Sequence, residues 1–108
     1  MDEHHHKLRE LFQRLTAQFI AENSNLTSLI TVTNFELSPK LTTATAYISV
    51  YPTSAEVGAL GFAKRKRSEL RDYIKKNART RIIPRIDFEI DLGEKNRQRM
   101  DELLSGKE

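Results

Sequence analysis

The sequence has no cysteine among its 108 residues. Neither a disulfide framework nor a thiolate metal site can therefore form, and a reducing compartment suits the chain. No apolar run approaches the roughly 20 residues that a membrane-spanning helix needs. Residues 1–6 also lack the basic start and apolar stretch of a signal peptide. We therefore expect a cytoplasmic protein without a membrane partner.

Acidic residues are scarce in one segment, residues 64–85. This segment holds ten basic residues and two acids, a balance of +8; because the whole chain carries +3, the remainder carries −5. A basic segment on an otherwise acidic domain creates a directed positive field, which is typical of a partner that carries phosphates. The alternative is a basic helix face that is merely solvated.

Apolar periodicity predicts helices near both ends of the chain. Apolar residues recur at helical spacing from Lys7 to Glu22 and indicate an amphipathic helix, preceded by a flexible tail over residues 1–6. Residues 94–104 predict a short polar helix whose apolar anchors are Met100, Leu103 and Leu104. We therefore assign one core domain to residues 7–92, followed by a terminal helix and tail over residues 93–108.

A second helical region is predicted to start with a Thr53 or Ser54 cap and to run to Asn77. Its apolar stripe consists of Leu60, Ala63, Leu70 and Ile74. Arg67 falls inside this stripe, where an unbroken buried helix should not carry charge. We therefore expect a kink at Lys66–Ser68 that separates two helices with clean apolar faces.

Three strands are predicted between and after these helices. Stretches rich in β-branched residues at 29–37 and 41–50 flank a turn at 38–40 and indicate a hairpin, with a bulge near Thr33 and Asn34. Small or apolar residues alternate with polar ones in the second strand and again after Pro84. This alternation predicts an α+β domain with the order α, β, β, α, α, β and helices on one face of the sheet.

The basic residues of the long helix differ in whether an acid lies at helical spacing. Arg65 with Glu69 and Lys76 with Asp72 have the spacing of weak exposed ion pairs. Lys64, Arg67, Arg71 and Lys75 share one sector of the helix, and the first three have no acid three or four positions away. The predicted RNA-binding residues are Lys64, Lys66, Arg67, Arg71, Lys75, Arg79, Arg81 and Arg85. Such a surface holds a phosphate backbone without reading bases.

Other candidate sites are weaker. Residues 58–61 match the Gly-x-x-Gly loop of KH domains, but their apolar interior favours a position inside a helix. The histidines at 4–6 could bind a metal, although an unanchored terminal run is more simply a tail. The acidic residues Asp87, Glu89 and Asp91 could hold magnesium in an RNA-processing enzyme, but they have no assembled catalytic partners and more simply solvate the sheet. We expect no enzyme activity and no cofactor.

Several segments together resemble the ribosome-binding factor A family. Three segments are similar to the family's pattern in order and spacing. They are the hairpin stretch Val32–Leu41 with the strand that follows it, the segment Arg79–Pro84 with the third strand, and the terminal run Arg99–Leu104. In this family an Ala-any-Gly kink commonly replaces the Gly-x-x-Gly loop. The corresponding position here is Lys66–Ser68, which has neither the alanine nor the glycine.

The resemblance implies a type II KH-like RNA-binding fold without a functional Gly-x-x-Gly loop. It also implies a protein that binds the small (30S) ribosomal subunit and its 16S ribosomal RNA and assists late maturation and rRNA processing. We expect the chain to be a monomer. The alternative is a generic KH-like RNA-binding or ribosome-associated regulatory module.

Overall fold

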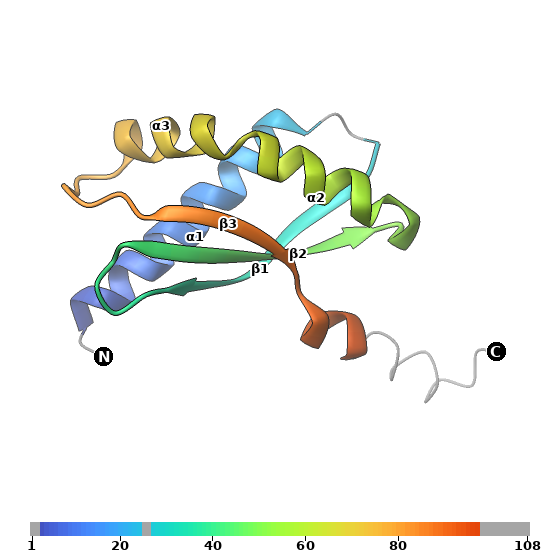
Figure 1. Ribbon diagram of the computed structural model, residues 1–108, viewed down its shortest axis with the longest axis horizontal. Helices are drawn as coiled ribbons and strands as arrows, with labels where there is room; N and C mark the ends of the chain where they lie inside the picture. Colours follow the sequence, from blue (N-terminus) through green and yellow to red (C-terminus); the bar gives the residue numbers. More distant parts are fainter. Residues whose placement is uncertain (1–2, 25–26, 98–108) are drawn as a thin grey trace.

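The computed structural model describes residues 3–24 and 27–97. Its elements in chain order are α1 (Glu3–Asn23), β1 (Leu29–Leu37), β2 (Thr43–Tyr51), the 3-10 turn η1 (Thr53–Ala55), α2 (Glu56–Arg65), α3 (Arg67–Asn77) and β3 (Arg85–Ile90). A helical turn over residues 92–97 follows. The predicted α+β class and element order are confirmed (Figure 1).

The three strands form one mixed sheet in the order β1-β2-β3. β1 pairs with β2 in antiparallel and β2 with β3 in parallel orientation. The three helices pack on one face, so alternate residues of β2 such as Ala44, Ala46 and Ile48 are buried while Thr45 and Tyr47 are partly exposed. The predicted one-sided packing of the sheet is therefore confirmed.

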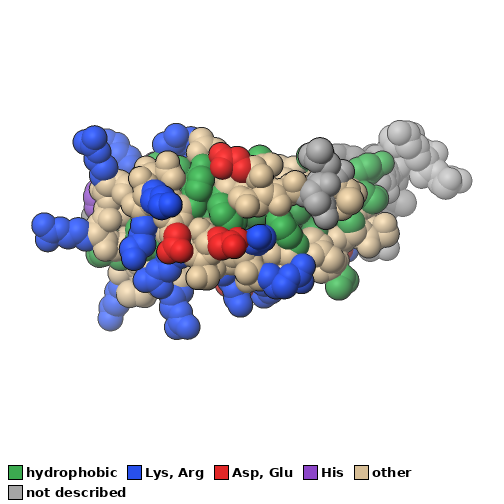
Figure 2. Space-filling model, turned by 90° about the horizontal axis from the view of Figure 1, so that it is seen from above, with side chains coloured by type: hydrophobic (Ala, Val, Ile, Leu, Met, Phe, Trp, Pro, Cys, Tyr) green, Lys and Arg blue, Asp and Glu red, His purple; other side chains and the backbone are tan. Residues whose placement is uncertain are grey.

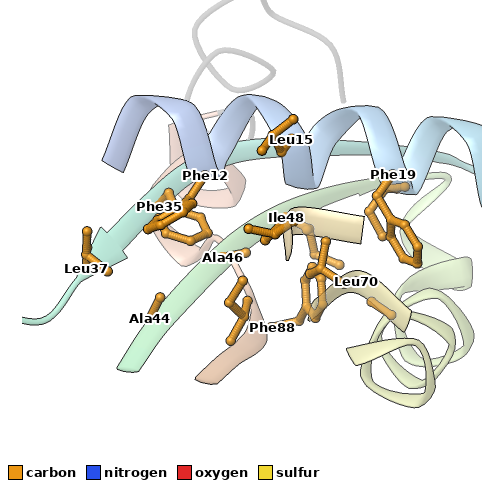
Figure 3. Packing of buried hydrophobic residues seen from close by; sticks show 14 of the residues in the cluster. Phe12, Leu15, Phe19, Phe35, Leu37, Ala44, Ala46, Ile48, Leu70 and Phe88 are labelled. Atoms are coloured by element: carbon orange, nitrogen blue, oxygen red, sulfur yellow. The ribbon is translucent and has the colours of Figure 1, made fainter. Parts of the chain in front are cut away.

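The core lies between α1, the sheet and the α2–α3 pair, as Figure 3 shows. Phe12 of α1 stacks at a tilt on Phe35 of β1 with ring centroids 6.3 Å apart. Phe88 and Leu70 are both fully buried. Of the predicted helical stripe, Ala63, Leu70 and Ile74 are buried, while Leu60 is only partly buried against the core.

The β1–β2 hairpin has the expected bulge and a longer turn than expected. The register shifts between Val32 and Asn34, which confirms the bulge at Thr33. β2 begins at Thr43 rather than at Leu41, because the Ser38 hydroxyl accepts hydrogen bonds from the amides of Thr42 and Thr43. Leu41 then adopts a left-handed backbone conformation, φ 63°, within the turn.

The predicted flexible tail is wrong for residues 3–6, because α1 already begins at Glu3. The Glu3–Lys7 ion pair and the His6–Glu10 contact have the i, i+4 spacing that supports a helix. His5 is buried, and its Nε2 atom lies 3.1 Å from the carbonyl oxygen of Ser38. His5 thus packs the start of α1 against the hairpin turn, while His4 and His6 are exposed.

The predicted kink is confirmed at Lys66, between the end of α2 and the start of α3. Lys66 has φ −95° and ψ 5°, a bridge conformation open to residues other than glycine. Its amide donates to the carbonyl oxygens of Phe62 and Ala63, and the Arg67 Nε atom donates to the Lys64 carbonyl oxygen at 2.9 Å. These bonds satisfy the end of α2, so the kink forms without the alanine and glycine common in the family.

The start of α2 differs from expectation. Thr53 and Ser54 lie in η1, and α2 begins at Glu56 with Ala55 before it and no side-chain capping bond. Both Gly58 and Gly61 lie inside α2, which confirms that residues 58–61 do not form a loop between helices. The acidic side chain of Glu56 remains in the first turn, where it complements the helix dipole.

The terminal helix starts earlier than predicted, at residue 92. Asp91 caps it, because the carboxylate oxygen Oδ1 of Asp91 accepts a hydrogen bond from the amide of Glu94 at 2.9 Å. Lys95 pairs with Glu56 of α2 at 3.0 Å. The predicted anchors Met100, Leu103 and Leu104 lie outside the described residues.

Replacing Leu70 tests how much its burial beside the kink stabilises the fold. We expect Leu70→Ala to lower the free energy of unfolding by about 2–5 kcal/mol, because it leaves a cavity beneath the first turn of α3. Urea unfolding followed by circular dichroism measures the change. Val57→Ala is the control: Val57 is 86% exposed, so its change should stay within about 0.5 kcal/mol. Equal effects of the two variants would contradict a packing role for Leu70.

Candidate nucleic-acid interface

A hollow of about 540 Å³ lies where the kink meets the first residues of β2 and β3. It is lined by Thr43, Ala44, Thr45, Arg67, Ser68, Arg71, Pro84, Arg85, Ile86 and Asp87. Three of the eight predicted RNA-binding residues therefore share this hollow. Guanidinium groups beside hydroxyls are donors that suit phosphate oxygens.

The parallel pairing of β2 and β3 brings these residues together. Thr43 lies opposite Arg85 in the register, and the Arg85 amide donates to the carbonyl oxygen of Thr42 at 2.9 Å. Pro84 is fully buried directly before this anchor and limits the backbone there. Arg67 and Arg71 reach the same place from the first two turns of α3.

Lys64 and Arg67 both bind Asp87, contrary to the expectation that they lack an acidic partner. The carboxylate oxygen Oδ1 of Asp87 lies 3.1 Å from the Lys64 ammonium and 2.9 Å from Arg67 Nη1. The Phe88 amide donates to the same oxygen at 2.8 Å. Helical spacing alone does not reveal this acidic partner, because Asp87 lies on β3, across the crossover.

The surroundings of Asp87 favour its charged form. Partial burial raises the pKa of Asp87. Its effect is outweighed by hydrogen bonds from the Phe88 amide and Lys64 and by the positive charges of Lys64 and Arg67, which lower the pKa. The pKa of Asp87 therefore lies below its usual value. At neutral pH the hollow thus contains one ionised carboxylate among its cations.

Lys66 also has an acidic partner. It pairs with Glu69 at 3.0 Å, and within residues 3–24 and 27–97 no ion pair joins Glu69 to Arg65. The predicted Lys76–Asp72 pair is likewise absent from the described part of the chain. The break at Lys66 changes the helical spacing near Glu69. Glu69 therefore pairs with Lys66 and not with Arg65, the partner that an unbroken helix predicts.

The remaining predicted residues are free of acidic partners within the described residues. They are Arg71, Lys75, Arg79, Arg81 and Arg85, all exposed. Arg71 and Arg85 line the hollow, whereas Lys75, Arg79 and Arg81 lie beyond its lining on α3 and in the loop between α3 and β3. In Figure 1 this loop and the hairpin turn share the left-hand end of the molecule, where Lys and Arg side chains gather in Figure 2.

Acidic side chains surround Tyr47 on the open face of the sheet. The Tyr47 hydroxyl donates to a carboxylate oxygen of Glu36 at 2.6 Å. This hydrogen bond, burial, and the charges of Glu36, Glu89 and Asp91 raise the pKa of Tyr47 to about 12. Arg85 lies on the same face of β3 as Glu89, but at the start of the strand. The carboxylates around Tyr47 repel phosphate, so the strand end beside the kink suits a nucleic acid better than the region around Tyr47.

Of the three predicted acidic residues, Asp87 and Asp91 have structural partners, while Glu89 is exposed. Asp87 is held by Lys64 and Arg67, whereas Asp91 accepts a hydrogen bond from the Thr33 hydroxyl at 2.5 Å and caps the terminal helix. Among the described residues no group of three or more His, Asp or Glu side chains is placed to hold a metal ion. In the same residues no helix is long and apolar enough to cross a membrane.

Sequence reasoning missed Arg9. A second hollow of about 660 Å³ is lined by His5, Arg9 and the hairpin, and it shares Thr43, Ala44 and Thr45 with the first. Arg9 thereby lies beside the same strand end as Arg71 and Arg85. Nothing in the sequence indicates this, because Arg9 belongs to an ordinary amphipathic helix far from the basic segment.

Comparisons with known proteins give one consistent family. The family model described as ribosome-binding factor A matches residues 4–104. A ribosome-binding factor A of Magnetococcus marinus is 30% identical over 87 residues, which span 81% of this chain and 71% of the relative. The crystal structure of ribosome-binding factor A from Thermus thermophilus is similar with a TM-score of 0.69 and 26% identity, covering 78% of this chain and 91% of that one.

A further similar structure shows a member of that family in a complex. It is a homology model of Thermus thermophilus ribosome binding factor A, fitted into a cryo-EM map of a complex with the 30S subunit. The TM-score is 0.68 at 25% identity, and the likeness covers 77% of this chain and 90% of the other. The KH-like fold of the chain is thus shared with these proteins.

Thr33 tests the electrostatics around Asp91. The Thr33 hydroxyl bond is the largest cause that lowers the pKa of Asp91, so Thr33→Val should raise this pKa toward its usual value. A lowered acid pKa stabilises the fold above the unfolded-state pKa and loses this effect as pH falls through the folded-state pKa. The stability lost in Thr33→Val should therefore be larger at neutral pH than in strong acid. NMR titration and unfolding at both pH values measure this; an unchanged Asp91 pKa would contradict it.

Proposed function

The chain belongs to the ribosome-binding factor A family, and from this premise we propose that it binds the small (30S) ribosomal subunit. The contact is made to 16S ribosomal RNA, and binding assists late maturation of the subunit and processing of its rRNA. The complex formed by the Thermus thermophilus relative supports this partner. The protein acts as a monomer.

One observation carries the proposal of an RNA contact. Arg71 and Arg85 line one hollow from α3 and β3, and both lack an acidic partner among the described residues. Their charge can therefore be neutralised by phosphates, with release of counterions from the RNA. The hydroxyls of Thr43, Thr45 and Ser68 add uncharged donors at the same place.

The other exposed cations extend this contact. Lys75 follows Arg71 by one helical turn, and Arg79 and Arg81 continue the positive charge toward β3. Such contacts position the protein on a phosphate backbone and read its shape rather than its bases. No bond is made or broken. A protein that binds one RNA conformation more tightly than another shifts the RNA toward that conformation, which is how binding assists maturation.

Co-sedimentation tests the partner. We expect the purified protein to sediment with free small subunits in preference to large subunits and assembled ribosomes, and to dissociate as salt is raised. The measurement is the bound fraction across a potassium chloride series. Equal binding to all particles would instead favour a generic KH-like RNA-binding module, and no binding at any salt would refute the proposal.

Arg71 tests the site. Arg71→Glu should weaken binding to small subunits by about tenfold or more, because a charge-assisted phosphate contact is worth roughly 1.5–3 kcal/mol. Lys76→Glu is the matched control, since Lys76 is also exposed on α3 but does not line the hollow. Circular dichroism should show both variants folded. Equal loss of binding in both variants would show that net charge, and not this site, determines the affinity.

A further inference from the structure

Two of the basic residues at the proposed RNA interface already form ion pairs within the protein. Lys64 and Arg67 converge on a single oxygen, Oδ1 of Asp87, at 3.1 and 2.9 Å. These are ordinary distances for the contact of a cation with a phosphate oxygen. The carboxylate lines the same hollow as Arg71 and Arg85. A negative group of the protein itself therefore lies among the donors that line the hollow.

We propose that Asp87 is a selectivity residue for RNA: its carboxylate takes the place of a phosphate oxygen between Lys64 and Arg67, so that an RNA must draw both cations away from it in order to bind them. This inference rests on the proposed function. It assigns to Asp87 a role opposite to that of its basic neighbours, because its charge lowers affinity for RNA that does not fit the hollow.

The backbone holds the carboxylate in place while the cations can leave it. Asp87 lies in β3 between buried Ile86 and Phe88, and the Phe88 amide donates to its Oδ1 atom at 2.8 Å. Lys64 and Arg67 approach from the kink on long side chains that are 38% and 48% exposed. Exposed ion pairs contribute little to stability, so a phosphate can take over either cation without disturbing the fold.

The exchange makes binding depend on the shape of the RNA. A cation that is already neutralised by Asp87 releases fewer counterions when it meets a phosphate, and it therefore adds little to non-specific affinity. An RNA whose phosphates reach Arg71 and Arg85 together is held at the hollow and can draw Lys64 and Arg67 away from the carboxylate. An RNA of another shape contacts only the unpaired cations and is repelled by Asp87, so it binds more weakly. The selectivity is the difference between the affinities for RNA that fits the hollow and RNA that does not.

The decisive variant is Asp87→Asn, which keeps the shape of the side chain and removes its charge. Its matched control is Glu89→Gln: Glu89 is exposed on the same strand and loses the same charge, but Lys64 and Arg67 do not bind it. Affinities are measured for free small subunits and for an unrelated double-stranded RNA across a potassium chloride series. Asp87→Glu, which keeps the charge, tests rescue.

We expect Asp87→Asn to bind the unrelated RNA about three- to tenfold more tightly, with a smaller gain for small subunits and a salt dependence steeper by about one counterion. Glu89→Gln and Asp87→Glu should bind nearly as the wild type does. If the wild type binds RNA but Asp87→Asn binds no more tightly than Glu89→Gln, the inference is wrong and the proposed function stands. If Asp87→Asn binds more weakly, Asp87 positions the cations and the inference is again wrong. A wild type that binds neither RNA would overturn the proposed function together with this inference.

Discussion

The parallel pairing of β2 with β3 is the constraint on which the rest of the structure depends. Parallel neighbours require a crossover that returns the chain to the end of the sheet at which it started. Here α2 and α3 make that crossover, and they break at Lys66. The break lies beside the β2–β3 pair, so cations from the middle of the crossover reach Asp87 on the strand that follows it. The hollow is thus a direct result of the topology.

Charge divides this small sheet along its strands. Carboxylates surround Tyr47 on the open face, while Arg85 at the start of β3 and Arg71 on α3 lack acidic partners among the described residues. A net charge of +3 conceals this separation. In the proposed complex the resulting field orients the domain as it approaches RNA, and the exposed arginines make the short-range contacts. Orientation and contact therefore have the same structural origin.

Much of the fold could be predicted because local patterns agree with the tertiary structure. Alternation located the buried face of β2, and the charged Arg67 in an apolar stripe located the kink. Contacts between distant segments could not be predicted in this way. The partner of Lys64 and Arg67 lies across the crossover, and Arg9 of α1 lines a second hollow that shares Thr43, Ala44 and Thr45 with the first. The histidine run was misjudged because its composition resembles a tail, whereas its i, i+4 pairs and the burial of His5 make it helix.

Arg67 connects the fold with the site and shows why the basic residues are not equivalent. Its Nε atom caps the end of α2 on the Lys64 carbonyl oxygen, and its Nη1 atom binds Asp87. A side chain with two internal partners can stabilise a kink that lacks alanine and glycine, but it is less available to RNA than Arg71, which has neither partner. Because local structure already engages Arg67, its replacement changes helix geometry and charge together. Arg71 and Arg85 are free of that coupling, so the proposed phosphate contacts depend chiefly on these two residues.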